Sequence, residues 1–116
     1  MIECLGEAFA LVRKHGVPPD AYLDVLTSSL FSAPVYRTYG GIIALDKYES
    51  VGFRLALGLK DVKLALQAAD NKAVPMPVAS LVHDRFLTGV ANGEADQDWS
   101  FLARLVAESA GLKPHS

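Results

Sequence analysis

The sequence predicts a single domain made only of helices. Three observations carry this prediction: apolar residues recur at helical spacing along most of the chain, prolines and glycines stand between these segments, and only residues 53–59 also alternate as a strand would. The 116 residues are 51% hydrophobic, which is enough for one core. We therefore expect an all-α bundle of four longer helices and one or two short ones.

Composition narrows the classes of function. The formal net charge is −2 and there is no basic block, so nucleic acid is not an expected partner. The single cysteine, Cys4, cannot form an internal disulfide and is expected in the core. No apolar run approaches the roughly 20 residues of a membrane span, and the first residues carry no signal-peptide pattern. We expect a cytoplasmic protein without a membrane partner.

The first predicted helix covers residues 2–15. Its apolar positions follow at intervals of three and four, basic residues occupy its last turn, and Gly16 suits the position after a helix end. No N-cap residue precedes it, which fits either a frayed N-terminus or a chain cut inside a longer helix. A second helix is expected at roughly 19–29, with Pro19 in its first turn.

The pattern is weakest between the second helix and residue 53. Ser32 can cap a short helix that has Pro34 in its first turn. Residues 38–52 contain three glycines, so we expect a loop there, with room for one helical turn. Long ordered loops are often functional, although a solvated connector is the commoner case.

The most regular segment is a helix expected at about 54–72. Two apolar stripes run along it on nearly opposite sides. The first consists of Leu55, Leu59, Val62, Leu66 and Ala69, and the second of Leu57, Leu64 and Ala68. A helix that is apolar on two sides is expected in the centre of a bundle. Asp61 falls outside the polar sector that carries Lys60, so we expect it to be buried and to need a partner.

Two further helices complete the expected fold. One covers residues 77–91 and begins with Pro77, and the other covers about 99–110. Asp98 or Asp96 can cap the last helix. We favour capping over an acid–base pair for these two carboxylates because both stand just before a helix.

Patterns typical of catalytic and phosphate-binding sites are absent from the sequence. It contains no G-x-G-x-x-G, P-loop or G-x-S-x-G motif, and one cysteine with three scattered histidines does not give metal-ligand spacing. We predict no metal site and no catalytic residue. His83 is interpreted as structural or at the solvent edge, and His115 is expected in a frayed tail.

Lys60 is the one candidate binding residue. The ordinary interpretation is a surface lysine, but a lysine on a rigid helix can reach a phosphate, a ribose hydroxyl or a carboxylate. The neighbouring Asp61 is interpreted as the structural member of the pair.

Residues 53–65 resemble the signature F-x-L-x-L-x-x-K-D-L-x-L-A of the β-hydroxyacid dehydrogenases, with Val62 in place of a leucine. That family includes 3-hydroxyisobutyrate dehydrogenase and relatives of 6-phosphogluconate dehydrogenase. Residues 7–16 and 93–100 resemble its E-A-x-x-L-x-x-x-x-G and G-x-x-D-x-D-x-S elements. The resemblance implies that residues 1–116 are the C-terminal helical domain, used for substrate binding and dimerisation, and that they begin inside the interdomain helix.

The resemblance also implies cofactor and partners. In this family an N-terminal Rossmann domain binds NAD or NADP, the substrate is a small hydroxyacid, and a homodimer is expected. Lys60 matches the lysine that contacts the dinucleotide, and Phe53 matches an aromatic residue packed near the cleft. The family's catalytic lysine and cofactor glycines have no match here, so the chain alone is expected to be inactive. The alternative is a stand-alone helical dimerisation module without catalysis.

Overall fold

The computed structural model describes residues 1–114, and these residues form helices without a strand. His115 lies outside the described residues. The elements are α1 (Ile2–Lys14), α2 (Pro19–Thr27), α3 (Pro34–Leu45), α4 (Leu55–Asn71), α5 (Pro77–Ala91), the 3₁₀ helix η1 (Trp99–Phe101) and α6 (Leu102–Ser109). For these residues the predicted helical class agrees with the structure. None of these helices combines the length and the apolar character that crossing a bilayer requires.

Local sequence explains most helix boundaries. Proline occupies the first position of α2, α3 and α5, where its missing N–H is not needed. The residues after α1 and α5 include Gly16 and Gly93, with φ of 78° and 82°, a conformation that is strained for residues with a side chain. The boundaries expected from proline and glycine therefore agree with the structure to within about two residues, as is usual for helix ends.

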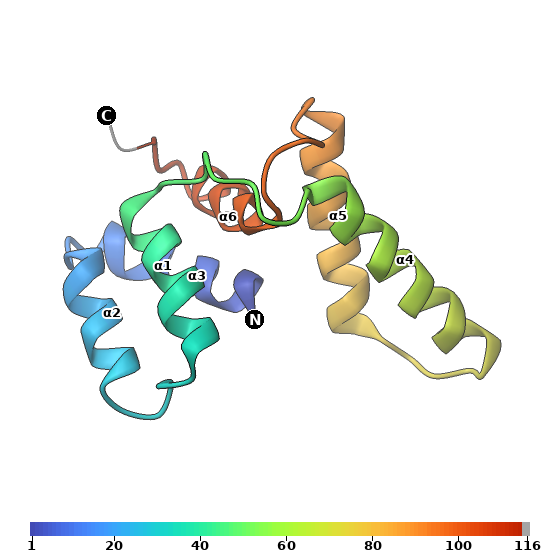
Figure 1. Ribbon diagram of the computed structural model, residues 1–116, viewed down its shortest axis with the longest axis horizontal. Coiled ribbons are helices and arrows are strands. Elements are labelled where there is room, and N and C mark those ends of the chain that lie inside the picture. Colours follow the sequence, from blue (N-terminus) through green and yellow to red (C-terminus); the bar gives the residue numbers. More distant parts are fainter. Residues whose placement is uncertain (115–116) are drawn as a thin grey trace.

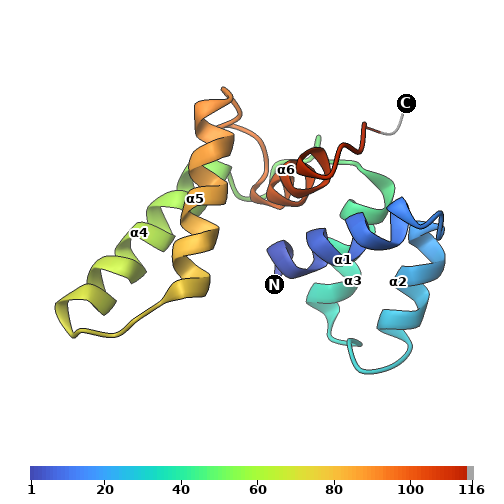
Figure 2. The same ribbon diagram turned by 180° about the vertical axis from the view of Figure 1, so that it is seen from behind.

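The helices form two regions. In the first, called the body here, α1 packs against α6 and α3, and α2 packs against α3. In the second, called the hairpin, α4 and α5 pack against each other and are joined by residues 72–76. Figure 1 and Figure 2 show the hairpin on one side of the molecule, α1 to α3 on the other, and α6 between them.

The body has a buried core in which helices approach closely. The Phe9 side chain is 1% exposed. Gly6 lies against α6, and a Cβ atom on this glycine would come within 3.1 Å of the Ala103 Cα. Small residues thus allow α1 and α6 to pack tightly. The buried apolar residues of this core are Leu5, Phe9, Ile43, Ala44 and Ala103.

The hairpin is far less buried, and the prediction of a central α4 is wrong. The second apolar stripe is exposed to solvent, with Leu57 at 39% and Leu64 at 55%. No residue from Lys60 to Arg85 is buried. An apolar face allows another helix to pack on that side. Whether another helix does pack there depends on the tertiary fold. The end of the hairpin where α4 begins and α5 ends is called its base. There the hairpin packs against η1 and α6 in a second buried cluster, formed by Leu55, Leu59, Phe86, Phe101, Leu102, Leu105 and Val106.

The loop expected over residues 38–52 is also a wrong prediction for its first half, because α3 continues to Leu45. Gly40 is buried inside this helix, and a side chain there would collide with Leu23 of α2. The glycine therefore serves close helix packing instead of a turn. The helix ends at Asp46, which has a left-handed conformation with φ of 55°.

Candidate functional site

A buried carboxylate ties the start of α4 to η1. Asp98 is 4% exposed. Its Oδ1 accepts the backbone N–H groups of Gly52 at 2.9 Å and Phe53 at 3.0 Å, and its Oδ2 accepts the N–H of Ser100 at 3.0 Å and the Ser100 hydroxyl. The prediction that Asp98 caps the last helical segment is confirmed. Asp96 instead forms an exposed ion pair with Arg54 at 3.1 Å.

The charge of Asp98 strengthens this connection. Burial alone would raise the pKa of the carboxyl group, but the hydrogen bonds from Ser100, Phe53 and Gly52 hold it below its ordinary value. Two backbone hydrogen bonds run beside the carboxylate, from Trp99 N–H to the Phe53 carbonyl at 2.7 Å and from Leu55 N–H to the Gln97 carbonyl at 2.8 Å. We call this set of bonds between residues 52–55 and 97–100 the clamp.

The clamp brings three aromatic side chains together. Trp99 packs against Phe53 with ring centroids 4.8 Å apart, and against Tyr39 of α3 at 6.1 Å. The indole N–H of Trp99 donates a hydrogen bond to the Tyr39 Oη at 2.8 Å. Sequence reasoning placed Phe53 beside a cleft but missed the Tyr39–Trp99 pair, because these residues are 60 positions apart and carry no shared motif.

Tyr39 and Trp99 line a cleft of about 290 Å³ between the body and the hairpin, called the central cleft here. Both regions contribute to it, since α1, α3, α4, α5, η1 and α6 all border the space. Most of its walls are apolar, which suits a small organic ligand. The lining residues with polar side chains are Glu3, Tyr39, Asp61 and Trp99, and the apolar ones include Val35, Val62, Val82, Phe86 and Leu102.

One of the two carboxylates in the central cleft is neutralised by an ion pair. Glu3 is 6% exposed, and its two oxygens accept hydrogen bonds from Arg85 Nε at 3.2 Å and Nη2 at 3.0 Å. Arg85 also donates to the Ser109 hydroxyl at 3.3 Å, so the guanidinium joins α5 to both α1 and α6. Asp61 forms no ion pair with any other residue in the range 1–114, and it leaves the central cleft with one free negative charge.

The structure separates the two residues of the predicted Lys60–Asp61 pair. Gly58, Asp61 and Val62 line the central cleft, and at about 100° per residue Lys60 lies on nearly the opposite side of α4. Both Lys60 and Asp61 are exposed. The prediction that Asp61 is buried is therefore wrong: its side of α4 faces the cleft, not another helix. Lys60 shares its outer face with Lys63, and its role in cofactor binding stays a prediction.

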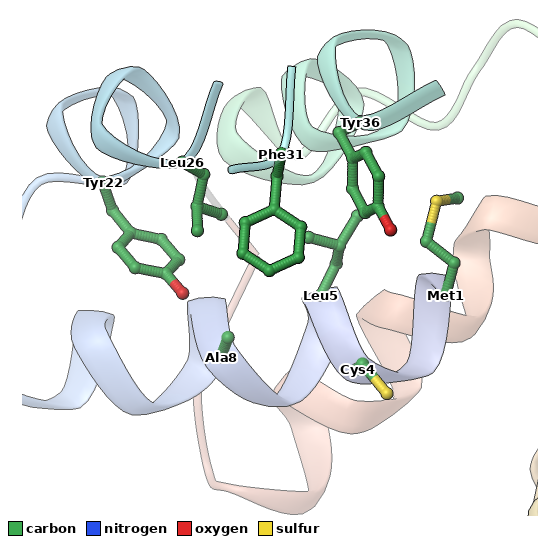
Figure 3. A pocket seen from close by; sticks show the side chains of 8 residues that line it. All are labelled: Met1, Cys4, Leu5, Ala8, Tyr22, Leu26, Phe31 and Tyr36. Atoms are coloured by element: carbon green, nitrogen blue, oxygen red, sulfur yellow. The ribbon is translucent and has the colours of Figure 1, made fainter. Parts of the chain in front are cut away.

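A second hollow lies within the body, and its walls are mostly apolar, with the hydroxyls of Tyr22 and Tyr36 and the thiol of Cys4 as polar groups. Figure 3 shows Tyr22, Leu26, Phe31 and Tyr36 pointing toward α1 across a groove of about 380 Å³. Cys4 lies at this groove and is exposed, so its predicted core position is wrong. No charged side chain from residues 1–114 lines the groove. The central cleft, which combines apolar walls with a hydroxyl and a carboxylate, is the better candidate site.

Parts of known proteins are similar to this chain in sequence and in fold. Residues 1–106 match the family described as "NAD-binding of NADP-dependent 3-hydroxyisobutyrate dehydrogenase". The uncharacterized oxidoreductase YfjR of Bacillus subtilis is 40% identical over 106 residues, which cover 91% of this chain and 37% of that protein. The 2-hydroxy-3-oxopropionate reductase of Escherichia coli is 30% identical over 112 residues, which cover 97% of this chain and 38% of that protein.

A solved structure supports the helical fold. The crystal structure of 3-hydroxyisobutyrate dehydrogenase from Salmonella typhimurium superimposes with a TM-score of 0.80 at 23% identity, over 90% of this chain and 36% of that one. The chain thus spans little more than a third of the length of the relatives that it matches.

Proposed function

Because the chain belongs to the NAD-binding family of NADP-dependent 3-hydroxyisobutyrate dehydrogenases, we propose that it is one helical part of an oxidoreductase that uses NAD or NADP. The match over residues 1–106 is the observation that carries this proposal. Relatives are named for reductions of 2-hydroxy-3-oxopropionate and of glyoxylate and succinic semialdehyde. A small hydroxyacid, or the aldehyde related to it, is the substrate class that we propose for the whole protein.

We propose that the chain is the C-terminal helical domain of that enzyme and works with a Rossmann domain. A Rossmann domain is built on parallel strands with a glycine-rich turn. Residues 1–114 contain no strand, and the sequence contains no G-x-G-x-x-G motif. These observations support an arrangement in which a Rossmann domain binds the pyrophosphate of the cofactor. This chain would then contact the cofactor and the substrate on the side that faces away from the Rossmann domain.

The charges on α4 fit a contact with a dinucleotide. Lys60 and Lys63 share an exposed face, and within the described part of the chain neither is ion-paired. When it is bound, the nicotinamide ring accepts or donates the hydride. Lys60 would hold an anionic or hydroxyl oxygen of the cofactor through its ammonium group. The opposite side of α4 borders the central cleft.

A cofactor titration of the whole protein tests this function. We expect Lys60→Ala to raise the Kd for NADPH about tenfold, because one charge-assisted hydrogen bond is lost. Lys72→Ala, which removes an exposed lysine at the far end of α4, is the matched control and should leave the Kd unchanged. An unchanged Kd in Lys60→Ala would remove Lys60 from the cofactor site, and a whole protein that binds neither NAD(H) nor NADP(H) would refute the proposed function.

A stand-alone dimerisation module is the second candidate function. The exposed apolar side chains of the hairpin favour it, because exposed apolar surface promotes association. Leu57, Leu64, Val78 and Leu81 are between 39% and 74% exposed. Analytical ultracentrifugation of the chain discriminates here: a monomer at all concentrations would count against this candidate and against the homodimer that the family resemblance implies.

A further inference from the structure

The Tyr39 hydroxyl has a proton that no described residue accepts. Its oxygen already accepts the indole N–H of Trp99 at 2.8 Å. A phenol can accept and donate at the same time, so this contact turns the O–H away from Trp99 and leaves it available to another oxygen. Tyr39 is half-buried and lines the central cleft. The hydroxyl is therefore a hydrogen-bond donor held in a fixed orientation.

The other groups that line the central cleft determine which ligand atoms the Tyr39 hydroxyl can bind. Among the described residues, Tyr39 and Trp99 are the only side chains with an N–H or O–H donor that line the central cleft, and the Trp99 donor is used by Tyr39. Asp61 supplies a negative charge, and Glu3 is paired with Arg85. The side chains that line the cleft thus offer one donated O–H, one free carboxylate and apolar walls, and the main chain of Met1 also borders it. A ligand carboxylate placed there would be repelled by Asp61, whereas a neutral oxygen would not.

We propose that Tyr39 is a specificity-determining residue: its hydroxyl donates to an uncharged carbonyl or hydroxyl oxygen of a small ligand in the central cleft, and Trp99 orients that hydroxyl. The inference rests on the proposed function, because hydroxyacids and semialdehydes carry a neutral oxygen at one end and a carboxylate at the other. This cleft takes the neutral end, and the carboxylate is recognised elsewhere in the enzyme.

Trp99 gives a direct spectroscopic readout of this contact. It is the only tryptophan of the chain, so its indole N–H produces a single NMR resonance. When the Tyr39 hydroxyl donates to a ligand oxygen, its own oxygen becomes a better acceptor, since chained hydrogen bonds polarise one another. Ligand binding should then move the indole N–H resonance downfield. Because Trp99 also lines the cleft, this shift supports the proposal only if it is absent in Tyr39→Phe at saturating ligand.

The experiment is an NMR titration of the ¹⁵N-labelled chain with butanone, a neutral carbonyl probe, and with butanoate, an anion with the same number of carbons. Butanone should shift the indole resonance downfield and saturate, and butanoate should bind at least several-fold more weakly. Tyr39→Phe should raise the butanone Kd about fivefold, the loss of one neutral hydrogen bond. Tyr36→Phe is the control, because Tyr36 is on the same helix but lines the apolar groove.

A second variant keeps the proposal testable if Tyr39→Phe does not fold. Trp99→Phe retains the Tyr39 hydroxyl but removes its orienting donor, and it should also weaken butanone binding, measured at the backbone amide of Gly58 in the cleft wall. Equal butanone affinity in wild type and Tyr39→Phe, a preference for butanoate, or no binding of butanone would each overturn the proposal. The Lys60 titration with NADPH does not involve Tyr39, so the two proposals can fail separately.

Discussion

The body and the hairpin are both helical, but different interactions stabilise them. The body is held by buried apolar side chains such as Phe9, which is 1% exposed. The hairpin has no buried residue between Lys60 and Arg85. It is held at its base by the buried cluster that contains Leu55, by Asp98 and by the Glu3–Arg85 ion pair. Elements that contact ligands often belong to the less stable parts of a protein. The comparison indicates that contacts at the base of the hairpin, both apolar and polar, position the side of α4 that faces the cleft.

Removing the most buried side chain of the body should have the largest effect. Phe9→Ala deletes a ring that packs edge-on against Tyr22, with ring centroids 5.2 Å apart, and leaves a cavity. We expect the free energy of unfolding to fall by about 4 kcal/mol, measured by urea denaturation. A loss below about 1 kcal/mol would mean that the body does not depend on this core.

Breaking the clamp should come next. Asp98→Ala leaves the N–H groups of Gly52, Phe53 and Ser100 without their acceptor, and we expect a loss of about 3 kcal/mol in the free energy of unfolding. Asp98→Asn retains an acceptor oxygen and should lose less. If both substitutions were neutral, the clamp would not be what holds the base of the hairpin.

The clamp also predicts a dependence of stability on pH. The pKa of Asp98 is lower in the folded chain than its ordinary value of 3.8. Its stabilising contribution is therefore complete above that ordinary value and is lost as the pH falls through the lowered pKa. Urea denaturation at a series of acidic pH values should show this loss in wild type and a smaller loss in Asp98→Asn. Identical pH profiles would contradict the assignment.

The ion pair between the regions should give a smaller effect than the clamp. Arg85→Ala leaves the carboxylate of Glu3 buried without a partner, but Arg85 is 26% exposed and solvent screens part of the interaction. We expect a loss of about 2 kcal/mol, largely restored when Glu3→Gln is added to Arg85→Ala. A double-mutant cycle with no coupling energy would show that the pair does not join the two regions.

Truncation of a side chain in the second apolar stripe of α4, which is exposed to solvent, should have the smallest effect. Leu64 is 55% exposed and packs against no core, so Leu64→Ala should change the free energy of unfolding by less than about 0.5 kcal/mol. A loss above about 2 kcal/mol in the monomeric chain would show that this face is covered, as the central position predicted from the sequence requires.

The sequence was sufficient for the helices but not for their arrangement. The spacing of apolar residues and the position of Pro77 predicted α5 at residues 77–91, the range found in the structure. Residues 53–59 fit both a strand pattern and a helix pattern, and the structure explains both. Arg54 is extended and forms a β-bridge with Asp98, and the helix begins at Leu55. Periodicity could not show whether Leu57 would find a neighbour, because that depends on where other helices lie.

The candidate site was predictable only in part, for the same reason. Asp98 could be recognised as a cap from its place before a helix. The helical pattern predicts that Asp61 is buried against another helix, yet its side of α4 faces the central cleft. The hydrogen bond between Tyr39 and Trp99 has no local signal, since the two residues meet only through the tertiary fold.

Native-state hydrogen exchange of the chain tests the difference between body and hairpin most directly. The backbone amides of residues 63–70 in α4 should exchange through openings of lower free energy than those of residues 6–10 in α1. In Asp98→Asn the opening free energies should fall further in the hairpin than in α1. Equal protection of the two regions in wild type, lowered together by the substitution, would contradict the account.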